Sequence, residues 1–227
     1  MPIVTVRDLK RTYKQGLLDV HALRGVDLDI EPGEFTALMG PSGSGKTTLL
    51  NQIGALDKPS SGSVKVDGQE LAGMSKAQLS GLRLNRIGFV FQAYNLIPVL
   101  TAFENAEFVL MMRGISVADR KARVMQTLAD VGLEGMEHRR PAELSGGQQQ
   151  RVAVARAIVG EPALVLADEP TANLDSKTGN DLIALMRRLT AEKGITFVFA
   201  THDPKVMEAA TRVVNMVDGE VAEDIRK

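Results

Sequence analysis

One stretch of the sequence combines glycine, lysine and threonine at a spacing that suits phosphate binding. It comprises Gly40, Pro41, Ser42, Gly43, Ser44, Gly45, Lys46, Thr47 and Thr48. The glycines let the backbone pass close to a phosphate, so that backbone N–H groups point at the anion. We expect Lys46 to reach the β- and γ-phosphates of a nucleotide and the Thr47 hydroxyl to bind Mg²⁺. The pattern G-x-x-x-x-G-K-[ST] between an apolar run and a helix predicts a P-loop.

Two carboxylates follow a second apolar run. Residues 163–167 are all apolar, and Asp168 and Glu169 come next. Charge is costly at the tip of a buried strand, so the pair indicates a function. We expect Asp168 to bind Mg²⁺ and Glu169 to polarise a water molecule. The alternative, an ion pair that caps the next helix, is disfavoured by the P-loop upstream.

A second candidate phosphate site lies in L-S-G-G-Q. It consists of Ser145, Gly146, Gly147 and Gln148, directly before an apolar-faced helix. Backbone N–H groups at a helix N-terminus attract anions. A flexible serine-glycine linker is the alternative, but linkers rarely open straight into such a helix.

Three single residues are less decisive. Tyr13 follows the first predicted strand, and an aromatic ring near a purine can stack on it. Gln92 and His202 each follow a predicted strand, at the strand end where α/β proteins bind ligands. From the residues alone, a half-exposed tyrosine and a solvated glutamine are the simpler interpretations. The position of His202, which matches that of Asp168 and Glu169, favours a functional role.

The elements that must position these residues are indicated by periodicity. Alternating residues predict strands at 3–7 and 26–30, in an antiparallel layer beside the nucleotide, and at 63–67. Apolar runs predict buried strands at 35–39, 87–91, 163–167 and 195–200. Between about 95 and 140, two capping-box patterns introduce helices and no strand pattern intervenes. The prediction is an α/β fold: a P-loop NTPase core with an antiparallel β subdomain and an inserted all-helical subdomain.

Composition narrows the class of protein. The chain has 227 residues, 44% of them apolar, which suits one large ordered domain. A net charge of −1 gives no reason to expect nucleic acid or an anionic membrane as an electrostatic partner. There is no cysteine, no signal-peptide pattern and no run near 18 apolar residues. We therefore expect no nucleic-acid partner and no direct membrane insertion.

Taken together, the motifs resemble the ATP-binding cassette (ABC) family along essentially the whole chain. They occur in the family's order: G-P-S-G-S-G-K-T, then Gln92, L-S-G-G-Q, L-V-L-A-D-E-P, N-L-D and T-H-D. The resemblance implies a single nucleotide-binding domain over 1–227. Its α/β core with the β subdomain would occupy 1–93 and 160–227. The helical subdomain, including the signature helix, would occupy 94–159.

The resemblance also implies a role for each matching residue. ATP and Mg²⁺ would be the cofactors. Tyr13 would stack on adenine, and Gln92 would sense Mg²⁺ and the membrane subunit. The signature, Leu144 to Gln148, would contact the γ-phosphate of the other subunit's ATP. Glu169 would be the catalytic base, Asp175 the aspartate of the D-loop and His202 the switch histidine.

Two phosphate sites in one chain fit an assembly of two copies. One cassette needs only one such site, so two copies arranged head to tail would bury two ATP molecules. The family therefore implies a homodimer in the ATP-bound state and an integral-membrane permease partner. We expect a cytoplasmic transport ATPase, peripheral at the inner face of the cell membrane through that permease.

The finer resemblance is to the lipoprotein-releasing (LolD) and macrolide-export (MacB) type. It rests on residues 91–105, 140–148 and 167–175, although Ala172 stands where this type usually has glycine. Export or lipoprotein release is the implied function. The alternative is a mechanotransmitting ABC ATPase of a cell-division or envelope complex that moves no solute. A soluble ABC ATPase of DNA repair or translation is disfavoured, because there is no long coiled-coil insertion and no second cassette.

Overall fold

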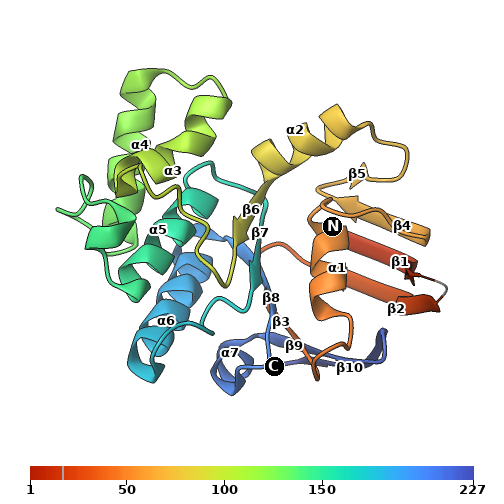
Figure 1. Ribbon diagram of the computed structural model, residues 1–227. Helices are drawn as coiled ribbons and strands as arrows, with labels where there is room; N and C mark the ends of the chain where they lie inside the picture. Colours follow the sequence, from red (N-terminus) through yellow and green to blue (C-terminus); the bar gives the residue numbers. More distant parts are fainter. Residues whose placement is uncertain (17) are drawn as a thin grey trace.

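Two β-sheets lie side by side in the computed structural model, which describes residues 1–16 and 18–227 and, of Gln15, only the backbone (Figure 1). The antiparallel sheet has the order β2-β1-β4-β5. Its strands are β1 (Val4–Gln15), β2 (Leu18–Ile30), β4 (Ser61–Val66) and β5 (Gln69–Glu70). The larger sheet has the order β10-β9-β3-β8-β7-β6. Its strands are β3 (Phe35–Met39), β6 (Ile87–Val90), β7 (Leu164–Asp168), β8 (Thr196–Ala200), β9 (Arg212–Val217) and β10 (Glu220–Arg226).

The central strands of the larger sheet are buried on both faces. All five residues of β3 and all five of β8 are buried, as expected for parallel strands covered by helices. Alternate residues enter two separate cores. Phe197 and Phe199 of β8 join the core formed with α3–α6, whereas Val198 and Ala200 join the core formed with the antiparallel sheet and α1. Packing on both faces of β3 and β8 therefore holds the ends of these strands in defined positions.

Helices cover both faces of this sheet. They are α1 (Lys46–Ile53), α2 (Lys76–Arg86), α3 (Ala102–Met112), α4 (Val117–Asp130), α5 (Gly146–Ile158), α6 (Ser176–Lys193) and α7 (Pro204–Ala209), with a 3₁₀ turn η1 (Pro141–Glu143). Figure 1 shows α3 and α4 on the side of the molecule opposite to the antiparallel sheet. Within the described residues, no helix is both long and apolar enough to cross a bilayer.

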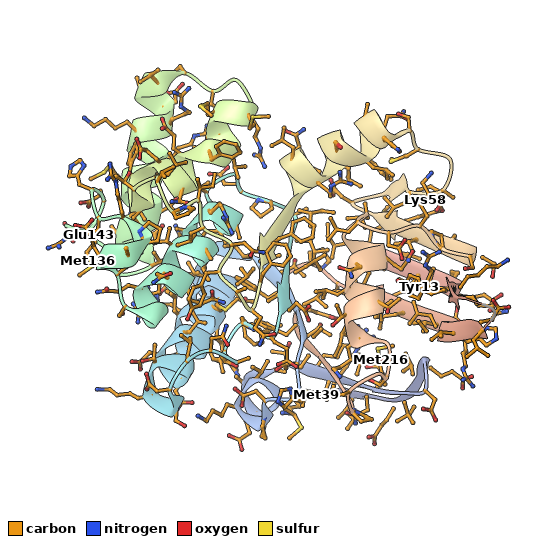
Figure 2. The ribbon with its side chains drawn as sticks, in the orientation of Figure 1. Tyr13, Met39, Lys58, Met136, Glu143 and Met216 are labelled. Carbon is orange, nitrogen blue, oxygen red and sulfur yellow. The ribbon has the colours of Figure 1, made fainter. Side chains whose placement is uncertain are left out.

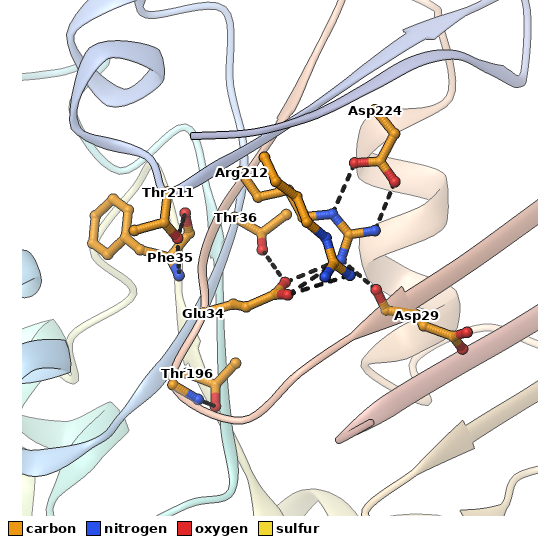
Figure 3. Close-up of polar contacts among 10 residues, drawn as sticks. Asp29, Glu34, Phe35, Thr36, Thr196, Thr211, Arg212 and Asp224 are labelled. Carbon is orange, nitrogen blue, oxygen red and sulfur yellow. Dashed lines mark hydrogen bonds and ion pairs between the residues drawn. The ribbon is translucent and has the colours of Figure 1, made fainter. Parts of the chain in front are cut away.

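A buried arginine fixes the C-terminal hairpin to the sheet (Figure 3). Arg212 on β9 is 4% exposed and donates to both carboxylate oxygens of Asp224 on β10, at 2.8 and 2.7 Å. The same guanidinium donates to Glu34, before β3, at 3.1 Å and to the backbone carbonyl of Asp29 at the end of β2. One side chain therefore ties the two sheets together.

The α/β fold predicted from the sequence is confirmed, with differences at particular elements. The capping box predicted for α3 is complete, with reciprocal hydrogen bonds between Thr101 and Glu104. At α4 only one half is present: the Ser116 side chain accepts from the Asp119 N–H. Helix α2 was not predicted, although Ser75 and Gln78 form a capping box at its start. Its polar composition hid the apolar face, because only Leu79 and Leu82 are buried.

The first two strands are longer than predicted, and this corrects one residue's position. Tyr13 was expected in the loop after the first strand, but it lies within β1, opposite Val20 of β2. The antiparallel ladder continues past the half-buried part, through irregularities in register. Backbone hydrogen bonds maintain the pairing there, so no apolar alternation marks it in the sequence.

Candidate active site

The predicted site residues gather at one edge of the larger sheet. Strands β3, β8, β7 and β6 are parallel neighbours, so their carboxyl ends share one edge. The P-loop follows β3 and His202 follows β8. Asp168 and Glu169 come at the end of β7, and Gln92 follows β6. This edge is the usual ligand crevice of an open α/β sheet.

The P-loop is a tight turn that only glycine permits at two points. Gly40 and Gly45 have φ values of 142° and 99°. A Cβ on Gly40 would lie 2.2 Å from the Met216 carbonyl oxygen, and one on Gly45 would lie 2.6 Å from that of Ala22. Carbonyl groups of β9 and β2 therefore leave no room for a side chain at these two positions, whereas residues 41–43 of the loop are exposed.

The start of α1 has the properties of a phosphate site. No described side chain caps this helix, and its first turn carries no acidic residue. Its first N–H groups are thus free to bind an anion. Lys46 is 8% exposed, and its ammonium group donates to the Gly40 and Pro41 carbonyls at 2.7 and 2.9 Å. The buried Ser44 hydroxyl has no hydrogen-bond partner in the described part of the chain.

Thr47 and Asp168 form a pair suited to Mg²⁺. The Thr47 hydroxyl donates to Asp168 Oδ1 at 3.1 Å. Burial raises the pKa of Asp168, the hydrogen bond from Thr47 opposes that rise, and the nearby Glu169 charge adds to it. Mg²⁺ usually binds one or two carboxylates and keeps waters or phosphate oxygens as its other ligands. The two oxygen donors present fit that requirement.

Gln92 lies one strand away from this pair. It is exposed in the turn after β6, and its backbone carbonyl accepts from Asn173 Nδ2 at 2.9 Å. Among the described contacts, none joins its side chain to Thr47 or Asp168. The structure places Gln92 at the predicted edge but does not bring it into the Thr47–Asp168 pair.

Glu169 is held by two residues from the end of the neighbouring strand. Its Oε2 accepts from the Thr201 hydroxyl at 2.8 Å, and its Oε1 lies 2.7 Å from His202 Nδ1. An ionised carboxylate only accepts, so Nδ1 of His202 carries the proton in this contact. The backbone of Glu169 has a φ of 44°, unusual for a residue with a side chain. Thr201 belongs to the T-H-D motif, but no role in the site was predicted for it, because its contact with Glu169 joins segments distant in sequence.

The signature residues lie at a second helix N-terminus, away from the P-loop. Ser145 caps α5, forming a reciprocal capping box with Gln148. Gly146 and Gly147 follow, and a Cβ on Gly147 would lie 2.2 Å from Thr178 Cγ2 at the start of α6. In Figure 2, Glu143, two residues before Ser145, lies far from Met39, which directly precedes the P-loop. The chain therefore presents two separate groups of backbone N–H donors.

Asp175 caps the neighbouring helix. It accepts from the backbone N–H groups of Lys177 and Thr178, both at 3.0 Å, and from the Thr178 hydroxyl. These hydrogen bonds lower the pKa of Asp175, with the Thr178 hydroxyl the largest cause. The N-termini of α5 and α6 are adjacent through Gly147 and Thr178.

Comparison with known proteins decides the family. Residues 23–172 match the family model described as "ABC transporter". The chain belongs to the ABC transporter family. It is an ABC ATPase cassette and binds ATP.

Two relatives and one solved structure show the range of similar proteins. The cassette is 45% identical over 221 residues to the macrolide export ATP-binding/permease protein MacB of Syntrophobacter fumaroxidans, covering 96% of the chain but 31% of that relative. It is 46% identical over 224 residues to the lipoprotein-releasing system ATP-binding protein LolD of Anaeromyxobacter dehalogenans, covering 98% and 94%. The chain thus spans about a third of the MacB relative and nearly all of the LolD one. The dimeric post-hydrolysis state of the ATP-binding cassette MJ0796, bound to ADP and Pi, has a TM-score of 0.89 and 44% identity, covering 98% of both chains.

Two side chains of α5, which sequence reasoning missed, connect parts of the cassette site. Gln150 is fully buried, and its Nε2 donates to the carbonyls of Pro170, at 2.8 Å, and Phe91, at 3.3 Å. Arg156 donates to the carbonyls of Tyr94 and Asn95. The signature helix thus holds the segment around Gln92. Within the Q-Q-Q run, no local signal singles out Gln150.

Proposed function

We propose that the cassette is the ATP-hydrolysing subunit of a membrane transport complex, and that export or lipoprotein release is the process it drives. The observation that carries the proposal is the edge formed by β3, β8, β7 and β6. It gathers a phosphate loop, a Thr–Asp oxygen pair and a glutamate held by two hydrogen bonds at one end of the sheet. The names of the MacB and LolD relatives support the type of transport.

In this proposal, the phosphate groups of ATP bind to the N–H groups at the start of α1. Lys46 exchanges its two carbonyl contacts for the β- and γ-phosphate oxygens. Thr47 and Asp168 would hold Mg²⁺, with Gln92 after β6 as a further candidate ligand, and the ion would offset charge on the phosphates. The ring of Tyr13 stacks on adenine.

Hydrolysis then depends on Glu169. Its carboxylate accepts a proton from the attacking water, whose oxygen forms the new bond to the γ-phosphorus. The bond from that phosphorus to the β–γ bridging oxygen breaks, giving ADP and phosphate. Thr201 and His202 fix the carboxylate, and His202 is 76% exposed, so its ring is open to a ligand or a second chain.

We extend the proposal to a homodimer in the ATP-bound state. The distance between the signature and the P-loop supports it, because one chain does not close both groups of donors on one nucleotide. Ser145, Gly146, Gly147 and Gln148 of one copy would contact the ATP held by its partner, with Asp175 beside them. The dimer named for the MJ0796 cassette supports this arrangement.

The proposed dimer acts on a permease. The cassette would be held at the inner face of the cell membrane by that permease, on the side of residues 94–159, whose motion relative to 1–93 and 160–227 would be transmitted. Exposed apolar side chains on α3 support a protein contact there, namely Phe108, Met111 and Met112.

Replacing Lys46 by alanine tests the ATP site. We expect Lys46→Ala to abolish tight binding, because the phosphates lose their main positive charge. The measurement is the rise in melting temperature with Mg-ATP, and Lys65→Ala, at an exposed lysine of β4, is the control. A Lys46→Ala chain that ATP stabilises as much as wild type would contradict the assignment.

A further inference from the structure

A single carboxylate organises the surroundings of Tyr13. Asp57, just after α1, accepts from the Tyr13 hydroxyl at 2.7 Å and from Arg11 Nη2 at 2.9 Å. It also accepts from Gln52 Nε2 at 3.1 Å. Gln52 belongs to α1 and is 1% exposed. The end of the tyrosine side chain is therefore connected to the helix that begins at the P-loop.

The ring of Tyr13 is also held from one side. The guanidinium carbon of Arg11 lies 4.3 Å from the ring centroid. Arg11 and Tyr13 are two residues apart on β1, so their side chains project from the same face of the strand. Tyr13 remains 37% exposed. Arg11 covers one face of the ring and Asp57 binds its hydroxyl. A ligand can therefore contact only the remaining exposed surface of the Tyr13 ring.

We propose that Arg11 and Asp57 are positioning residues, which hold Tyr13 as a one-sided platform for the base of the nucleotide. The inference rests on the proposed function, in which Tyr13 stacks on adenine. It adds that the platform is assembled before ATP binds. Figure 2 shows Tyr13 on the side of α1 that faces the antiparallel sheet.

The physical consequence is preorganisation of the base site. A tyrosine ring fixed in the free protein loses little further freedom when a base stacks on it. The planar guanidinium of Arg11 can stack on the ring as well as carry charge, which a lysine would not reproduce. Because α1 begins with Lys46 and Thr47 and is followed by Asp57, the same helix connects the phosphate site with the base site. The described hydrogen bonds of the Asp57 side chain reach Tyr13, Arg11, Gln52 and the Lys58 N–H but no P-loop residue, so its loss should weaken binding of the base and spare binding of the phosphates.

The test compares ligands with and without a base. Dissociation constants for ATP, ADP and inorganic tripolyphosphate are measured by calorimetry for wild type, Tyr13→Ala, Asp57→Ala and Arg11→Ala. Arg7→Ala is the matched control: Arg7 is on the same strand and pairs with Asp29 at 2.7 Å in an exposed contact. Melting temperatures without ligand identify any variant that fails to fold, and Arg11→Ala and Asp57→Ala serve as independent variants.

We expect Tyr13→Ala to weaken ATP and ADP binding by about 5- to 150-fold. Asp57→Ala and Arg11→Ala should each weaken both by about 2- to 10-fold. Tripolyphosphate affinity should be unchanged in every variant, and Arg7→Ala should behave as wild type throughout.

Each contrary result has a separate meaning. If Tyr13→Ala leaves ATP affinity unchanged, the stacking role in the proposed function is wrong, and the platform with it. If Tyr13→Ala weakens ATP binding but neither Asp57→Ala nor Arg11→Ala does, only the positioning inference is overturned. It is also overturned if Arg11→Ala tightens ATP binding, because Arg11 then competes with the base. An equal loss of tripolyphosphate affinity in Asp57→Ala would make Asp57 a support of the P-loop instead.

Discussion

At the scale of single residues, the site depends on how its two carboxylates are held. Asp168 is directed to Thr47, whereas Glu169 is held by Thr201 and His202. Neighbours in sequence thereby face different partners, one beside the P-loop and one beside the end of β8. Because their hydrogen-bond partners differ, the carboxylates of Asp168 and Glu169 are suited to different roles although the residues are adjacent.

Asp168 gives a prediction about stability and pH. Burial raises its pKa, so the stability that this group contributes is fully present below its unfolded-state pKa. That contribution is lost as the pH rises through the folded-state pKa. Without nucleotide, Asp168→Asn should therefore increase the free energy of unfolding at pH 7. Asparagine retains an oxygen that accepts from Thr47.

Urea denaturation of both chains at pH 7 and at pH 4 checks this. The difference between Asp168→Asn and wild type should shrink at the lower pH. A variant that is less stable than wild type at pH 7 would show that the carboxylate stabilises the free protein, contrary to the direction of its pKa.

At the scale of elements, the parallel strands position the site, and Arg212 on β9, with its partners Asp224 and Glu34, ties neighbouring segments to the same sheet. Arg212 is nearly inaccessible and holds two carboxylates from different segments (Figure 3). Removing one partner of a buried ion pair leaves charge without compensation, which is far more damaging than losing an exposed pair.

We expect Arg212→Ala to lower the free energy of unfolding by about 3–5 kcal/mol at neutral pH. Arg212 lowers the pKa of Asp224, so this stabilisation is present above the unfolded-state pKa of the aspartate and is lost as the pH falls. The deficit should shrink in acid. Urea denaturation measures it, and Arg7→Ala, which breaks the exposed pair with Asp29, is the control. A deficit as small as that of the control would mean that the cluster contributes little.

The elements also show what the sequence could and could not reveal. Strands β3, β7 and β8 and the P-loop were predicted because apolar runs and glycine spacing are local signals. Helix α2 and the outer part of β1 lacked those signals, so the first was missed and Tyr13 was misplaced. Thr201, Gln150 and Asp57 act through contacts between segments distant in sequence, which no local pattern records.

At the scale of the whole molecule, the cassette presents two helix N-termini, at the P-loop and at the signature, that we propose bind phosphate and that one chain does not bring together. Lys46 begins α1 and Ser145 caps α5, and Figure 1 shows these two helices well apart in the molecule. Their order along the chain was predictable, whereas their separation required the fold. A second copy, turned head to tail, would place each signature on the other copy's ATP.

The most direct test of this account is the state of the Glu169→Gln chain with Mg-ATP. Glutamine keeps the shape of the side chain and removes the base, so phosphate release should fall by about 10²- to 10⁴-fold. ATP binding should hold or tighten, because negative charge beside the γ-phosphate is lost.

The decisive measurement is the molar mass of Glu169→Gln by light scattering during size-exclusion chromatography with Mg-ATP. We predict a stable dimer that disappears when Ser145→Arg is added, since arginine crowds the shared site without touching the P-loop of its own chain. The double variant should still bind ATP as a monomer. A Glu169→Gln chain that remains monomeric while binding ATP, or a dimer that persists with Ser145→Arg, would contradict the shared site.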